Sequence, residues 1–181
     1  WTDMHSNIHH DQMEALPLWY EQIKKEMDFW PIAYYPFYMR PTSSGLAVED
    51  RYEDELIEKD WEQVRQLALQ AEKEGFPMFM GYEWQGAGLD GDHNVFFLEN
   101  GEKQEHPMRY QELVEAYKGK PVIGIPHHVA YQLGSRGKNW ETHDEKFSPF
   151  AEIYSSHGCS ENDDGPLMMN RHVHMGPRTG E

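Results

Sequence analysis

Histidine is the residue type most able to do chemistry in this chain of 181 residues. The sequence contains eleven histidines, and its 32 acidic residues outnumber 16 lysines and arginines, which gives a formal charge of −16. Imidazole is the commonest metal ligand in proteins and exchanges protons near neutral pH. This surplus of imidazoles and carboxylates predicts bound divalent cations, which would also reduce the repulsion between the negative charges.

The N-terminal segment from Asp3 to Asp11 holds the first candidate ligands. Alternation along a strand would place Asp3, His5 and Asn7 on one face. We therefore expect His5 and Asn7 to point toward one metal ion. His10 or Asp11 would reach the same ion from the following loop. The alternative is a hydrophilic N-terminal arm without a metal.

Two further candidates lie beside short apolar segments in the middle of the chain. Glu83 follows Gly81-Tyr82, and its two carboxylate oxygens could bridge two cations. An ion pair is the alternative for this carboxylate. His93 precedes the apolar run Val95–Leu98 and is either a metal ligand or a hydrogen-bonded core histidine.

The adjacent pair His127-His128 is the strongest local pattern, because it follows the apolar run Val122–Ile125 directly after Pro126. Neighbouring residues on a strand face opposite sides, so we expect one imidazole to bind metal and the other to act on the substrate. We assign the metal to His127 and the catalytic role to His128. His157, which follows a further apolar run, is a second catalytic candidate.

The sequence argues against several other classes of protein. Its negative charge is unsuited to nucleic acid or to an anionic membrane surface, which need clustered lysine and arginine. No apolar run approaches the roughly 18 residues of a membrane span. The single cysteine, Cys159, excludes an internal disulfide, and its acidic neighbours disfavour a thiolate nucleophile. Neither a Gly-x-Ser-x-Gly elbow nor a phosphate-binding glycine loop is present.

Hydrophobic periodicity predicts the alternating strands and helices that would position these residues. Helices are expected at 12–26, 54–74 and 107–118, strands at 28–35, 77–83, 93–98, 121–126 and 149–154, and loops at 36–53 and 159–181. This order favours a mainly parallel sheet or barrel. His5, Glu83 and His127 would then lie at the carboxyl ends of strands, the edge that carries the sites of such folds.

These motifs together resemble the PHP superfamily (polymerase and histidinol phosphatase) over most of the chain. The family's opening Asp-x-His-x-His falls on Asp3–Asn7, with asparagine in the second histidine position, and its Gly-x-Glu falls on Gly81–Glu83. A later strand-end His-Pro of the family falls on His127-His128. The resemblance implies a distorted (β/α)7 barrel with two or three divalent metal ions bridged by Glu83. A ligand set of nitrogen and oxygen atoms admits Zn, Mn or Fe.

Two features depart from the family pattern. The second strand ends at Tyr34-Tyr35, where the family has Thr-Asp-His, and the family's late Asp-x-His is missing before the last residue, Glu181. We therefore expect residues 1–158 to form an incomplete barrel of a PHP-like hydrolase domain. Residues 159–181 are expected to be an irregular segment that leads to missing strands of a longer protein.

The sequence predicts a metal-dependent hydrolase, with a phosphoester as the favoured small-molecule substrate. The predicted metal ligands are His5, Asn7, His10, Glu83, His93 and His127, and the predicted proton donors are His128 and His157. Two alternatives stay open: a non-catalytic PHP-like domain that binds metal or ligand within a larger protein, and a hydrolase of C–N or C–O bonds. No nucleic acid or membrane is expected as a partner, whereas a homo-oligomer or an additional domain is compatible with the sequence. The compartment is left open.

Overall fold

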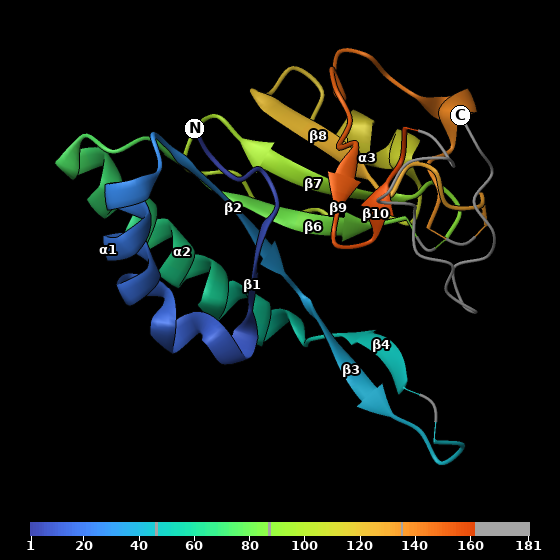
Figure 1. Ribbon diagram of the computed structural model, residues 1–181, viewed down its shortest axis with the longest axis horizontal. Coiled ribbons are helices and arrows are strands. Elements are labelled where there is room, and N and C mark those ends of the chain that lie inside the picture. The colour runs from blue at the N-terminus through green and yellow to red at the C-terminus, as the bar shows by residue number, and fades with distance from the viewer. Residues whose placement is uncertain (46, 87, 135, 162–181) are drawn as a thin grey trace. The chain divides into compact units, whose positions relative to one another are not determined.

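The chain forms two compact units in the computed structural model, which describes residues 1–45, 47–86, 88–134 and 136–161 (Figure 1). Unit 1 contains Trp1–Glu83 and Phe96–Glu102. Unit 2 contains Trp84–Val95 and the residues from Lys103 onward. Strands β6 (Gly81–Gln85) and β7 (Asp92–Phe97) contribute residues to both units because the chain passes from one unit to the other within them.

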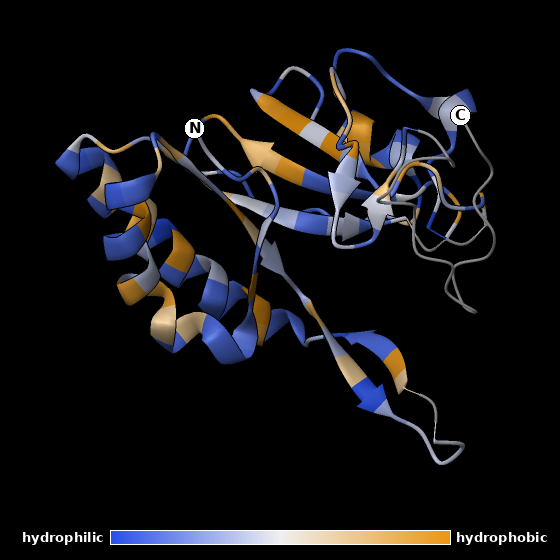
Figure 2. Ribbon diagram, viewed as in Figure 1, coloured by the Kyte–Doolittle hydropathy of each residue, from blue (hydrophilic) through white to orange (hydrophobic). Residues whose placement is uncertain are grey.

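The helices of unit 1 follow the predicted apolar periodicity. The short 3-10 helix η1 (His10–Ala15) leads into α1 (Leu16–Glu26), and Pro17 lies in the first turn, where its missing N–H is tolerated. Helix α2 (Asp54–Glu74) has the predicted bounds, and Figure 2 shows hydrophobic and hydrophilic residues alternating along it. Gly75 ends α2 in the left-handed conformation, at φ 75°.

Parallel pairs of strands build the sheet of unit 1. β1 (Ser6–His9) pairs with β2 (Trp30–Tyr35), which also pairs with β5 (Met78–Phe79) and with β6. β2 is therefore an inner strand and is buried through most of its length. A strand covered on both faces needs apolar residues throughout, which explains the unbroken run of its sequence.

The segment 36–53, predicted as a loop, contains the antiparallel hairpin of β3 (Phe37–Pro41) and β4 (Ala47–Arg51). The loop prediction is wrong because the turn-forming residues gather between the two strands, where the Gly45 N–H donates to the Thr42 carbonyl. The flanking residues are left free to pair through their backbones. In Figure 1 this hairpin extends away from α1 and α2.

A short turn joins β6 to β7, and the two strands run in opposite directions. Within unit 1 the Phe97 N–H donates to the Met80 carbonyl at 2.9 Å, and within unit 2 the Gly86 N–H donates to the Gly91 carbonyl at 3.2 Å. Gly91 has a φ of 78°, and a Cβ on it would lie 2.9 Å from the Lys138 Cα. This close approach requires glycine at the point where β7 begins.

Unit 2 places β8 (Val122–His127) beside β7, and α3 (Tyr110–Ala116) lies in the connection between them. Helix α3 ends at Ala116 and begins later than the predicted range 107–118, because Asp90 fixes where it begins. The Asp90 carboxylate accepts hydrogen bonds from the Tyr110 N–H at 2.9 Å and from the Arg109 guanidinium at 2.8 Å. Burial alone would raise the pKa of Asp90, but these donors outweigh it and lower the pKa.

The strand predicted at 149–154 is wrong for most of its length. The structure has η2 (Trp140–Thr142) before this segment and only two-residue strands, β9 (Tyr154–Ser155) and β10 (Gly158–Cys159), at its end. The apolar side chains of Phe150 and Ile153 are about half exposed. The segment therefore lacks the buried face that a regular strand of this composition would need.

The predicted (β/α)7 barrel, complete or partial, is also wrong. Within the described residues the fold is mixed α/β with three α-helices. The hydrogen-bonded strands follow the open order β1-β2-β6-β7-β8, with β5 beside β2, and do not close. A (β/α) barrel needs a crossover helix between neighbouring parallel strands, whereas the chain reverses its direction between β6 and β7. From residue 162 on, the irregular segment predicted at 159–181 lies outside the described residues.

Candidate metal centre

Unit 2 brings one carboxylate and two imidazoles together at buried positions. Asp92, His127 and His128 each offer one ligand atom, and the three atoms lie within 4.8 Å of one another. The three residues are buried, with exposed fractions of 3%, 0% and 5%. Two histidines and one carboxylate suit a divalent transition metal, and a set of three protein ligands leaves coordination positions for water or substrate.

Strand direction explains how these residues meet. His127 is the last residue of β8, and Asp92 is the first residue of the neighbouring strand β7. The two side chains can lie together because β8 runs in the opposite direction to β7. The site is therefore built from the carboxyl end of one strand and the amino end of the next.

His128 has an uncommon backbone conformation at this site. Its φ is 49°, the one positive value outside glycine in the described part of the chain. Left-handed backbone in a residue other than glycine costs energy, although histidine adopts it more readily than most residues, and such residues cluster at functional sites. The expectation that the two imidazoles face opposite sides does not hold, because the turn leaves the rings of His127 and His128 4.2 Å apart between their centres.

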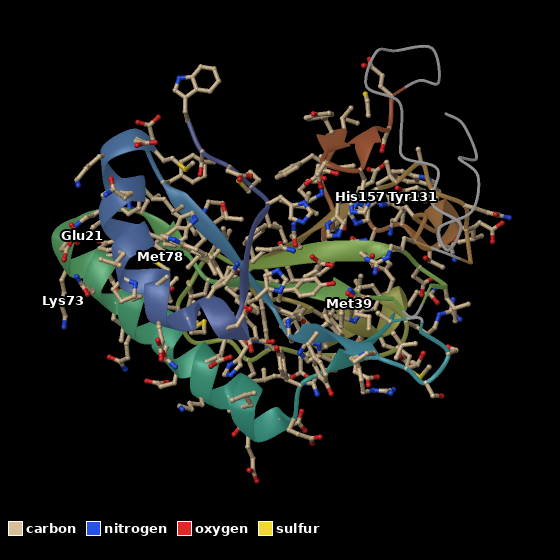
Figure 3. The ribbon with its side chains drawn as sticks, turned by 60° about the horizontal axis from the view of Figure 1, so that its bottom comes forward. Glu21, Met39, Lys73, Met78, Tyr131 and His157 are labelled. Atoms are coloured by element: carbon tan, nitrogen blue, oxygen red, sulfur yellow. The ribbon has the colours of Figure 1, made fainter. Side chains whose placement is uncertain are left out.

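Three further side chains of unit 2 surround this group. Arg136 Nη1 donates to Asp92 Oδ2 at 3.0 Å, and His128 Nε2 lies 3.9 Å from the same oxygen. The centre of the His157 ring lies 4.2 Å from that of His128, and His157 Nδ1 is 3.2 Å from the Tyr131 hydroxyl. Figure 3 shows Tyr131 and His157 next to each other. A guanidinium and an imidazole oriented by a phenol therefore stand beside the three candidate ligands.

His93 lies elsewhere in unit 2. Alternation along β7 directs its side chain to the face opposite Asp92. Its ring stacks on that of Tyr110 at 4.8 Å, and its Nε2 lies 3.2 Å from Lys138 Nζ. Burial lowers the pKa of His93 well below its ordinary value, and the charge of Lys138 adds to this shift. The imidazole is therefore neutral and placed as in the core-histidine alternative.

Lys138 is a buried amine, with an exposed fraction of 4%. Its Nζ lies 3.5 Å from the centre of the Tyr110 ring, within the range of a cation–π contact. Burial lowers the pKa of Lys138 to about 8, although the Asp90 carboxylate acts to raise it. The ammonium form is therefore less favourable in the folded chain than in the unfolded chain.

We expect the contribution of Lys138 to the free energy of unfolding to increase as the pH rises from about 8 to 10.5. In this window the unfolded lysine keeps its proton up to its ordinary pKa of 10.5, whereas the folded lysine has lost it. Stability rises with pH wherever the unfolded chain binds more protons. His93 and Tyr110, which face the amine, stay uncharged because burial lowers the pKa of the imidazole and raises that of the phenol.

Urea unfolding of the wild type and of Lys138→Met at about pH 7 and about pH 10 measures this effect. The free energy of unfolding of the wild type minus that of the variant should be larger at pH 10 than at pH 7 by about 1–3 kcal/mol, since one pKa unit is worth about 1.4 kcal/mol. Comparison with the variant cancels the titration of all other groups. The same difference at both pH values would contradict the lowered pKa of Lys138.

Unit 1 holds a second group of predicted ligands. Glu83 is buried, and its Oε2 accepts a hydrogen bond from Asn7 Nδ2 at 2.8 Å and lies 3.7 Å from His5 Nε2. The structure therefore brings His5, Asn7 and Glu83 together. Strand ends do not explain the meeting, because His5 precedes β1 and Glu83 lies in the middle of β6.

His10 belongs to a different arrangement in unit 1. Its Nδ1 lies 2.8 Å from Oδ2 of Asp60, a buried residue of α2, and this oxygen also accepts from the Tyr34 hydroxyl at 2.8 Å. Burial raises the pKa of Tyr34, and the hydrogen bond to Asp60 adds to the shift, so the phenol stays a donor. Within the described ranges, His10 is outside the groups of three metal-capable side chains.

Each unit brings some of the predicted site residues together. His5, Asn7 and Glu83 meet in unit 1, and His127 meets His128 in unit 2. The convergence of His5, Glu83 and His127 at one site would involve both units and stays a prediction.

Three residues of the unit 2 site, Asp92, Arg136 and Tyr131, are not among the predicted site residues. Asp92 carries a usable pattern, an acidic residue directly before His93 at the start of an apolar strand. A parallel sheet is expected to carry its site at the carboxyl ends of strands. Asp92 lies at the amino end of a strand, so this expectation does not include it. Arg136 and Tyr131 lie in a segment without periodicity, which gives no such indication.

Compared with models of known protein families, with curated proteins and with solved structures, the chain shows no match. The resemblance to the PHP superfamily therefore rests on the motifs alone. In the part of the chain that the structure describes, no helix has the length and apolar character needed to cross a membrane.

Proposed function

We propose that the chain is a metal-dependent hydrolase whose unit 2 binds a divalent cation through Asp92, His127 and His128, with a phosphoester as its substrate. The observation that carries this proposal is the burial of three ligand atoms within 4.8 Å of one another. A buried carboxylate and two buried imidazoles are a costly arrangement without a function, because each loses its hydration. The left-handed backbone of His128 adds a second local cost at the same place.

The donor set fits Zn, Mn or Fe, since imidazole and carboxylate are ligands that these metals accept. A bound cation would supply positive charge to a developing oxyanion and would lower the pKa of a water molecule. Among the residues of the chain, His157 is placed to give a proton to the leaving group. Its Nδ1 is engaged with the Tyr131 hydroxyl, so we assign the transferred proton to Nε2.

Metal analysis and a hydrolysis screen test the proposal together. The protein is purified without chelator, its metal content is measured, and phosphate mono- and diesters are offered with Zn or Mn added. We expect at least one ion per chain and hydrolysis of one of these ester classes. Bound metal without hydrolysis of any ester would favour the non-catalytic alternative. Absence of both would contradict the proposal.

Glu83→Gln tests whether the unit 1 group holds a further ion. We expect the variant to bind one ion fewer than the wild type, because a neutral amide is a poor metal ligand. The fold should survive, since the change is nearly isosteric and Asn7 can donate to an amide oxygen as well. Metal stoichiometry and circular dichroism measure the two effects. An unchanged number of ions would contradict a metal role for Glu83.

A further inference from the structure

Asn94 is a buried polar residue whose hydrogen-bonding capacity is not used. Its exposed fraction is 1%, and neither its amide nitrogen nor its amide oxygen has a hydrogen-bond partner in the described structure. A buried polar group without a partner costs about 1–3 kcal/mol. Such groups are rare in native proteins and call for an explanation, such as a ligand that completes the hydrogen bonds.

The position of Asn94 links it to the candidate metal site. It lies two residues after Asp92 on β7, so alternation places both side chains on the same face of the strand. His93 lies between them and faces the other way, toward Tyr110. Asn94 therefore lies on the face of β7 that carries the proposed metal ligand Asp92. It does not belong to the aromatic packing around His93.

Arg136 supplies the charge that an anionic ligand would need on this face. Its Nη1 donates to Asp92 Oδ2 at 3.0 Å, and the side chain is 26% exposed, so it is open in part to solvent. A guanidinium offers several N–H donors in a planar fork that matches two oxygens of one anion. Because the chain has a formal charge of −16, most of it would repel an anion. A positively charged side chain at this place therefore points to a site for an anion.

We propose that Asn94 and Arg136 bind the phosphate group of the substrate beside the cation of unit 2. The Asn94 amide N–H would donate to one oxygen, the Arg136 fork to one or two, and the cation would face another. Such a set needs at least three oxygens around one centre, which a phosphate group has and a carboxylate lacks. This inference rests on the proposed function, because the cation at Asp92 supplies part of the anion site.

Inorganic phosphate is the probe for the test. Its affinity is measured by calorimetry on the full chain loaded with one equivalent of metal, and metal affinity is measured separately. Asn94→Leu should weaken phosphate binding by about 10- to 100-fold, the range for one hydrogen bond to a charged group. Metal affinity should stay unchanged, and the free energy of unfolding should stay equal or rise, because the buried amide is gone.

Two more variants keep the test decisive if the leucine protein folds poorly. Asn94→Asp is nearly isosteric and replaces a donor with a negative charge, so phosphate binding should fall further while metal is retained. Arg136→Gln should also weaken phosphate binding by at least about 10-fold. Lys118→Gln removes a positive charge elsewhere in unit 2, where Lys118 pairs with Glu115, and should leave phosphate affinity unchanged.

The pattern of results separates this inference from the proposed function. Metal binding with equal phosphate affinity in the wild type, Asn94→Asp and Arg136→Gln would overturn the anion site alone. Failure of the wild type to bind metal would overturn both the proposed function and the anion site. Selective loss of phosphate affinity in the variants at Asn94 and Arg136 supports both.

Discussion

His127→Ala is expected to lower the affinity of the chain for zinc by at least about 100-fold. Loss of a residue that only supports a metal ligand typically costs 10- to 100-fold, and the loss of a ligand itself should cost no less. His127 is the most deeply buried of the three proposed ligands, so water cannot easily replace its imidazole without a rearrangement of the site. Competition with a chelator of known affinity measures the change.

Two variants accompany this experiment. Asp92→Asn is nearly isosteric and should also reduce zinc affinity, which separates loss of a ligand from loss of packing at position 127. His106→Ala is the matched control. His106 lies in unit 2 beside Gln104, and its substitution removes an imidazole outside the proposed site. Equal zinc affinity in His127→Ala, Asp92→Asn and His106→Ala would show that the ion, if any, binds elsewhere.

His157→Ala is expected to slow hydrolysis of an alkyl phosphate by about 10²–10⁴-fold while the metal stays bound, as for the loss of a general acid. The reason is the position of the imidazole, beside His128 and with its Nδ1 at the Tyr131 hydroxyl. Tyr131→Phe removes the orienting group and keeps the imidazole, so its effect should be smaller. Turnover and metal stoichiometry are measured on the same preparations.

The choice of leaving group gives this prediction a sharper form. An aryl phosphate with an activated leaving group departs without needing a proton, so the loss of His157 should slow its hydrolysis much less. A purely structural role would affect both esters equally. An equal loss on both, or a loss of metal in His157→Ala, would contradict proton donation by His157.

The elements that follow local patterns could be predicted from the sequence. Helix α2 has its predicted bounds because an apolar stripe and Gly75 define it locally. β8 lies within one residue of its predicted range and ends at His127, as expected of an apolar run followed by polar residues. These features depend on periodicity and on turn-forming residues, which are properties of neighbouring positions.

The features that escaped prediction depend on contacts between distant positions or on single dihedral angles. Because the chain reverses between β6 and β7, the amino end of β7 meets the site. Asp92, which lies just before the predicted strand 93–98, thereby becomes a candidate ligand. The φ of 49° at His128 places two neighbouring imidazoles together, which regular strand geometry forbids. The unused amide of Asn94 can be recognised only once its burial is known.

Zinc-edge anomalous diffraction from crystals of the protein loaded with one equivalent of zinc tests the central claim most directly. The account predicts one strong peak in unit 2, with Asp92, His127 and His128 each placing a ligand atom about 2.0–2.2 Å from it. A limited amount of metal keeps weak surface sites from filling. A peak away from these three residues, or a crystal of the loaded protein without an ordered zinc ion, would contradict the account.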